Sequence, residues 1–162
     1  MTYIPTVTRR EMLTSTLRAV AAVAGAMLPT IAGGMTARTP LTVYKDASCR
    51  CCGKWVMHMR ENGFSPKVAD RTDMDALKDS MGVPNGLRSC HTAIAGKYII
   101  EGHVPAADVK RLLSTMPHGV LGVAAPGMPG GSPGMEGTGK PDVYTVIAFG
   151  ANGDTSVFAR HG

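Results

Sequence analysis

Residues 41–63 have the sequence LTVYKDASCRCCGKWVMHMRENG, in which a β-like run gives way to a helical pattern. The opening LTVYK is rich in β-forming residues and predicts a strand. A loop with three cysteines follows, and Cys52, Trp55 and Val56 then recur at helical spacing. Gly63 ends the predicted helix. The stretch therefore predicts the first strand–loop–helix unit of an α/β fold, with its cysteines at the junction.

The residues that follow continue to alternate between short strands and amphipathic helices. We expect, in chain order, a strand at 66–70, a helix at 72–82, a hairpin of 91–95 and 97–102, and a helix after Pro105. Gly and Pro dominate residues 117–141, so neither helix nor strand is expected there. A last hairpin is expected from 144–150 and 155–159. The predicted fold is α/β, with the order β-α-β-α-β-β-α, a Gly/Pro/Met-rich loop and an extra C-terminal β-hairpin.

The composition fits one small globular domain rather than two. The chain has 162 residues, of which 44% are hydrophobic and only 5% aromatic, and it contains 11 Met. Its net charge of +5 would fall to +3 without residues 1–37, which hold three arginines and one glutamate. Lys and Arg form no run in the remainder, so the sequence does not predict a nucleic acid as partner.

Residues 1–37 have the pattern of an export signal. Within them, TRREML (8–13) resembles a twin-arginine signal, and an Ala- and Gly-rich stretch leads to a cleavage-like MTA. Arg18 interrupts this weakly apolar stretch, whereas a membrane anchor needs about 20 strongly apolar residues. We expect a signal peptide over 1–37, a mature domain over 41–160, a periplasmic location and no permanent membrane anchor. The alternative is a basic, disordered N-terminus with an incidental amphipathic helix.

The chain has four cysteines, Cys49, Cys51, Cys52 and Cys90. Paired cysteines of exported proteins become disulfides, but a Cys49–Cys52 bridge would close a very small loop and stabilise little. The helix N-terminus and the neighbouring basic side chains favour thiolates, which serve equally as nucleophiles and as soft-metal ligands. Cys90 precedes the predicted third strand at the same end of the sheet, so we expect it to face the other three.

Two parts of the chain resemble thioredoxin. Residues 49–52 contain a Cys-x-x-Cys at a strand-to-helix junction, and residues 86–113 are similar to the second half of thioredoxin, with SCHT in the place of its cis-proline. The resemblance implies a thioredoxin-like fold. The missing proline and the two added cysteines weigh against general disulfide exchange. A thiol–disulfide oxidoreductase that acts through Cys49 and Cys52 stays open as an alternative.

The chain is more closely similar to the CopG-type periplasmic copper-resistance proteins, a family with a thioredoxin-like fold and long catalogued as a domain of unknown function. Four motifs carry the resemblance: CRCCGKW (49–55), RSCHTA (88–93), EGHVPA (101–106) and PGMPGGSPGME (126–136). It covers about residues 41–160. It implies that the cysteines bind Cu(I) in a multinuclear copper–sulfur cluster, with other periplasmic copper-resistance proteins as possible partners.

The residue types agree with that implication. Thiolate and thioether ligands select Cu(I), whereas a structural zinc site draws on two separated Cys/His pairs, which makes zinc the less favoured metal. The resemblance and this ligand chemistry together give the expected metal ligands, which are Cys49, Cys51, Cys52, Cys90, His103, Met128 and Met135. Ligation by His91 stays open, because alternation along a strand would turn it away from Cys90.

Overall fold

The computed structural model describes residues 37–162, so the predicted signal peptide, apart from Ala37, lies outside the described residues. Within this range the chain forms seven strands, three α-helices and one short 3-10 helix. The strands are β1 (Thr39–Lys45), β2 (Phe64–Asp70), β3 (His91–Ala95), β4 (Tyr98–Gly102), β5 (Gly122–Ala125), β6 (Tyr144–Phe149) and β7 (Thr155–His161). The helices are α1 (Arg50–Glu61), α2 (Met74–Ser80), the 3-10 helix η1 (Asn85–Leu87) and α3 (Ala106–Thr115). None of the described helices is long and apolar enough to span a membrane.

All seven strands belong to one mixed sheet with the order β2-β1-β3-β4-β5-β6-β7. β1 pairs in parallel with β2 and antiparallel with β3, so β1 lies inside the sheet although it comes first in the chain. The C-terminal ends of β1 and β2 therefore lie at the same edge as the start of β3. This edge carries the cysteine loop after β1 and Cys90 before β3.

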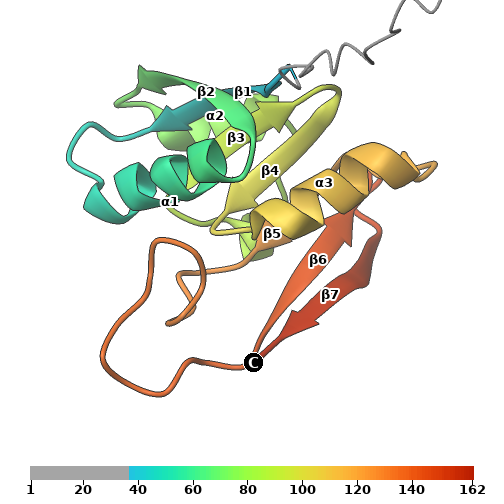
Figure 1. Cartoon of the computed structure of the whole chain (residues 1–162). Coiled ribbons are helices and arrows are strands. Elements are labelled where there is room, and N and C mark those ends of the chain that lie inside the picture. The colour runs from blue at the N-terminus through green and yellow to red at the C-terminus, as the bar shows by residue number, and fades with distance from the viewer. Residues whose placement is uncertain (1–36) are drawn as a thin grey trace, which may run out of the picture. The chain divides into compact units, whose positions relative to one another are not determined.

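Helices cover both faces of the sheet (Figure 1). On one face α1 and α3 pack over the larger core, which includes Trp55, Ile100 and Leu112. A smaller core that includes Ile99 and Phe149 lies on the other face, where α2 and η1 are found. Ile99 and Ile100 are neighbours on β4, and the alternation of side chains along a strand places them in the two different cores.

The α/β class is confirmed, and the elements through α3 follow the predicted order β-α-β-α-β-β-α. The C-terminal hairpin is also present as β6 and β7. The likeness of the first part to thioredoxin stays a prediction.

The expectation of no strand within 117–141 was wrong, because β5 lies inside that range and pairs with both β4 and β6. Its sequence, GVAA, contains a glycine and lies among Gly- and Pro-rich residues, so the local pattern favours a loop. The strand needs small residues here: a Cβ on Gly122 would lie 2.3 Å from the carbonyl oxygen of Ile99. Crowding against β4, rather than a turn, explains this glycine, and β5 joins the C-terminal hairpin to the rest of the sheet.

Candidate metal centre

The loop between β1 and α1 holds the first three cysteines in a fixed arrangement. Asp46 shapes the loop: one carboxylate oxygen accepts a hydrogen bond from the Ser48 N–H at 2.8 Å, and its carbonyl oxygen accepts one from the Cys49 N–H at 3.0 Å. Cys49 then precedes α1, and Cys51 and Cys52 lie in the first helical turn, which has no acidic residue. The predicted place of the cysteines at a helix N-terminus is confirmed.

Cys49 and Cys52 are joined by a disulfide bond, while Cys51 and Cys90 keep free thiols. Cys52 is fully buried. The structure thus shows the oxidised form of the Cys-x-x-Cys pair. A set of four thiolates requires reduction of this bond, because a disulfide sulfur carries no negative charge.

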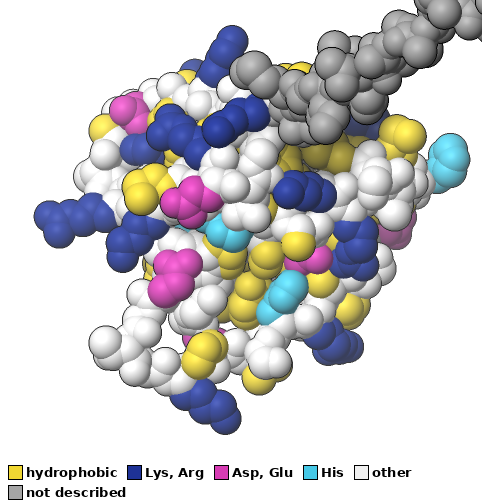
Figure 2. All heavy atoms as spheres, in the orientation of Figure 1, with side chains coloured by type: hydrophobic (Ala, Val, Ile, Leu, Met, Phe, Trp, Pro, Cys, Tyr) yellow, Lys and Arg dark blue, Asp and Glu magenta, His cyan; other side chains and the backbone are white. Residues whose placement is uncertain are grey.

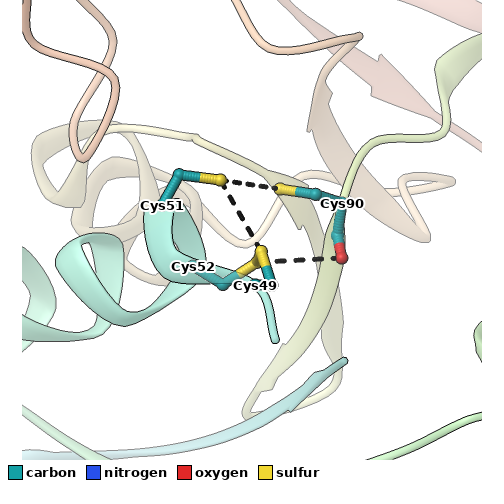
Figure 3. A group of neighbouring side chains, drawn as sticks. All are labelled: Cys49, Cys51, Cys52 and Cys90. Carbon is teal, nitrogen blue, oxygen red and sulfur yellow. Dashed lines mark hydrogen bonds between the residues drawn. A yellow bond between two sulfur atoms is a disulfide. The ribbon is translucent and has the colours of Figure 1, made fainter. Parts of the chain in front are cut away.

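Cys90 lies just before β3 and faces the other three cysteines, as predicted (Figure 3). The four sulfur atoms all lie within 4.8 Å of one another. The Sγ of Cys51 is 3.6 Å from that of Cys49 and 3.9 Å from that of Cys90. A group of four sulfurs this compact is suited to hold soft metal ions or to exchange a disulfide.

Burial raises the pKa of the Cys90 thiol to about 12, and the neighbouring Cys51 adds to this effect. Cys90 therefore carries its proton at neutral pH in the metal-free protein. A bound cation would supply the positive charge that a thiolate needs at this position.

Two histidines adjoin Cys90. His103 Nε2 lies 3.1 Å from the Cys90 Sγ, and His91 Nδ1 lies 3.3 Å from it. The Nδ1 of His103 is 2.8 Å from the carbonyl oxygen of Pro133. A carbonyl only accepts, so Nδ1 carries the hydrogen and, in the neutral ring, Nε2 turns a lone pair toward the sulfur. His103 is thus brought to the site in the tautomer that a metal ligand needs.

The expectation that His91 turns away from Cys90 was wrong. β3 begins at His91, so Cys90 lies before the strand and the alternation rule does not relate the two side chains. His91 is completely buried, and its ring lies 4.4 Å from that of Trp55. Its Nε2 has no hydrogen-bond partner among residues 37–162. Burial lowers the pKa of His91 well below the ordinary value and also lowers the pKa of His103, so both rings are neutral at pH 7.

The Gly/Pro/Met-rich loop lies against the first turns of α1. A Cβ on Gly134, whose φ is +87°, would lie 2.8 Å from the backbone N of Trp55 and 2.9 Å from the carbonyl oxygen of Cys51. The backbone next to Met135 is therefore at the site, and the Met135 side chain is half-buried. Met128 lies further along the loop and is 55% exposed. Ligation by either thioether stays a proposal.

Two charged residues near the site were not identified from the sequence. Glu101 on β4 and Lys78 on α2 form a buried ion pair. The Glu101 carboxylate also accepts hydrogen bonds from the Ser89 N–H at 2.7 Å and the Thr92 hydroxyl at 2.6 Å. It therefore holds the chain on both sides of Cys90. A glutamate inside the apolar run YIIEG was the signal available in the sequence.

Trp55 is a core residue. It is fully buried, and its Nε1–H donates to the carbonyl oxygen of Val104 at 2.9 Å.

On the face drawn in Figure 2, Lys and Arg side chains are dispersed among acidic and uncharged ones rather than gathered in one patch.

Comparisons with known proteins agree with the sequence resemblance. Residues 87–135 match the model of a family described as "Protein of unknown function, DUF411", a segment that includes Cys90, His103 and both loop methionines. Two solved structures of a copper resistance protein, CopG, are similar along most of the chain. Form 2 is 40% identical with a TM-score of 0.73 and covers 77% of this chain and 99% of its own. Form 1 is 40% identical with a TM-score of 0.72 and covers 76% and 98%. A search of curated proteins finds no significant match.

Proposed function

Because the chain belongs to the family of the copper resistance protein CopG, we propose that it is a periplasmic protein that sequesters Cu(I) in a multinuclear cysteine-thiolate cluster. Its copper-binding domain would be thioredoxin-like and would cross the inner membrane by the twin-arginine route. Its role would be copper resistance, with conversion between Cu(I) and Cu(II) as a possible second activity.

One observation carries the proposal: four sulfurs from two distant segments lie within 4.8 Å of one another, with the unprotonated Nε2 of His103 at the Sγ of Cys90. Thiolate and imidazole ligands in a group without carboxylates suit Cu(I). Adjacent cysteines such as Cys51 and Cys52 chelate one ion awkwardly but can bridge neighbouring ions. The three-plus-one grouping therefore supports a cluster over a mononuclear zinc site.

The test is an anaerobic Cu(I) titration of the reduced protein that measures copper bound per chain and free thiols remaining. We expect more than one copper per chain with all four thiols protected, and no displacement of copper by excess Zn(II). Cys90→Ser should lower the copper bound, because it removes the sulfur that faces the other three. Full loading of this variant, or a single Zn(II) bound in preference to copper, would refute the cluster.

The methionines can be tested against a matched control. Met128 on the loop and Met57 on α1 are equally exposed, at 55%. We expect Met128→Leu and Met135→Leu to weaken Cu(I) binding in competition with a chelator, and Met57→Leu to leave it unchanged. Equal affinities for all three variants would exclude thioether ligation.

The Cys49–Cys52 disulfide supports a second candidate, a thiol–disulfide oxidoreductase. This function predicts reduction of insulin by the metal-free protein, with loss of activity in Cys49→Ser and no change in Cys90→Ser. Copper binding predicts instead that Cys90→Ser lowers the copper bound per chain. The pair of variants therefore separates the two functions.

A further inference from the structure

The four cysteine sulfurs lie within 4.8 Å of one another, and Cys51 contacts both the disulfide and Cys90. The Cys49 Sγ, which is bonded to Cys52, lies 3.6 Å from the free thiol of Cys51, and Cys51 lies 3.9 Å from the free thiol of Cys90. Figure 3 shows the Cys51 sulfur next to both the disulfide and the Cys90 sulfur. We propose that the metal-free protein moves its disulfide internally, from Cys49–Cys52 to Cys51–Cys90, with Cys51 as the relay. This activity does not depend on copper binding.

In the first step the thiolate of Cys51 attacks the Sγ of Cys49. A Cys49–Cys51 bond forms, the Cys49–Cys52 bond breaks, and Cys52 leaves as a thiolate. Cys52 lies in the first turn of α1, where the N-terminal N–H groups and the helix dipole favour a negative charge. This geometry stabilises the charge on the sulfur that leaves.

In the second step the Cys90 thiol gives its proton to the Nε2 of His103, 3.1 Å away, as it attacks the Sγ of Cys51. A Cys51–Cys90 bond forms and Cys49 leaves. The proton of each attacking thiol ends on the sulfur that leaves, so two thiols and one disulfide are present before and after. No electron is gained or lost, and no outside oxidant or reductant takes part.

The relay has a consequence for access to the disulfide, because Cys52 is the one buried cysteine of the four. Cys52 is fully buried, whereas Cys51 and Cys90 are only partly covered. After the exchange the oxidised pair is Cys51–Cys90, and Cys49 and Cys52 are thiols. A reductant or a partner thiol can then act on a disulfide between two partly exposed cysteines, while the buried Cys52 is already a thiol.

The chain offers a direct way to follow the exchange, because trypsin separates the cysteines. Cleavage after Lys45, Arg50 and Lys54 gives DASCR with Cys49 and CCGK with Cys51 and Cys52. Cleavage after Arg88 and Lys97 gives SCHTAIAGK with Cys90. A Cys49–Cys52 disulfide links the first two peptides, and a Cys51–Cys90 disulfide links the last two.

The experiment uses the full chain with one disulfide, freed of metal by a chelator and kept without oxygen. The form that links DASCR to CCGK is isolated in acid, which stops exchange, and is returned to neutral pH. Samples are quenched in acid, alkylated with N-ethylmaleimide, digested and analysed by mass spectrometry. We expect the DASCR–CCGK linkage to fall and CCGK–SCHTAIAGK to appear, with a first-order rate constant that is independent of protein concentration.

Two variants test the relay. Cys90→Ser is the control, because it has no cysteine to receive the relayed disulfide and should keep the DASCR–CCGK linkage. Cys51→Ser, whose second peptide is SCGK, should form no link between SCGK and SCHTAIAGK. If Cys51→Ser forms this link as fast as the wild type forms its own, Cys52 reacts with Cys90 directly and the relay is refuted. An observed first-order rate constant that rises with protein concentration would show exchange between chains and overturn the proposal. An unchanged DASCR–CCGK linkage in the wild type after hours would also overturn it. Neither outcome needs a variant, so the folding of the variants does not decide the test.

Discussion

Substitution of Glu101 by Gln tests whether the buried ion pair holds Cys90 in place. Glu101 is 0% exposed and Lys78 is 2% exposed, and the Lys78 ammonium also donates to Thr92 at 2.9 Å. Gln keeps the shape of Glu but removes its charge, so the ammonium is left without its counter-ion. Removing one partner of a buried pair costs about 3–5 kcal/mol. The variant could instead bury Lys78 as a neutral amine. Deprotonating an ordinary lysine at pH 7 costs about 5 kcal/mol, so the loss of unfolding free energy should be of about this size at most.

The assay is urea unfolding of the reduced, metal-free protein at pH 7. We expect Glu101→Gln to lower the free energy of unfolding by about 3–5 kcal/mol. The double variant Lys78→Met/Glu101→Gln should recover part of that loss, because no charge is left unpaired. Glu61→Gln on the exposed side of α1 is the matched control, with an expected change within about 0.5 kcal/mol. A loss below about 1 kcal/mol for Glu101→Gln, or a double variant no more stable than the single one, would refute the reasoning.

Three further predictions follow from single contacts. Gly134→Ala should weaken Cu(I) binding, measured by chelator competition, because its Cβ would push the loop off α1, whereas Gly137→Ala meets nothing within 4 Å and should bind normally; equal affinities would show that the loop does not contribute. Gly122→Ala should lower the free energy of unfolding in urea by about 3 kcal/mol or more, since its Cβ would overlap a β4 carbonyl oxygen; an unchanged midpoint would contradict the tight β4–β5 packing. His58 accepts a hydrogen bond from the Ala106 N–H at 3.1 Å, and burial lowers its pKa. As the pH falls, the imidazole of His58 is protonated in the unfolded chain before it is protonated in the folded one. The contribution of His58 to the free energy of unfolding is therefore complete above about pH 6.5 and is lost as the pH drops below that value. The slope of the unfolding free energy against pH counts the protons taken up on unfolding. His58→Gln should lower this count by a fraction of one proton below about pH 6.5. An identical pH profile for the variant would show that His58 does not contribute to the pH dependence.

The sequence predicted those parts of the fold that depend on local pattern. Cys52 and Trp55 recur at helical spacing and lie in α1, and the place of Cys90 at the same sheet edge followed from the order of strands. β5 was not predicted, because its small residues are required by close contact with the neighbouring strand. A contact between distant segments leaves no pattern in the local sequence. The sheet order around β1 likewise depends on pairing between distant segments.

The site was predictable in its ligand types and less so in its state. Four cysteines and His103 are brought together as expected, but the sequence cannot say whether Cys49 and Cys52 are thiols or a disulfide, since both suit the same spacing. The place of His91 depended on the residue at which β3 begins, and strand ends are the least predictable boundaries. The Lys78–Glu101 pair joins two residues 23 positions apart, and such a pair carries no local signal.

The distance along the chain between Cys51 and Cys90 links metal affinity to folding. The two residues are 39 positions apart. In an unfolded chain, closing a loop of that length to bring the fourth sulfur to the other three costs about 3 kcal/mol. The folded sheet has already closed that loop, so a cation held by all four sulfurs would bind the folded chain more tightly by a factor on the order of 10² from this effect alone. By mass action the same cation would stabilise the fold, and a chain that lost Cys90 would keep three neighbouring thiols and lose this coupling.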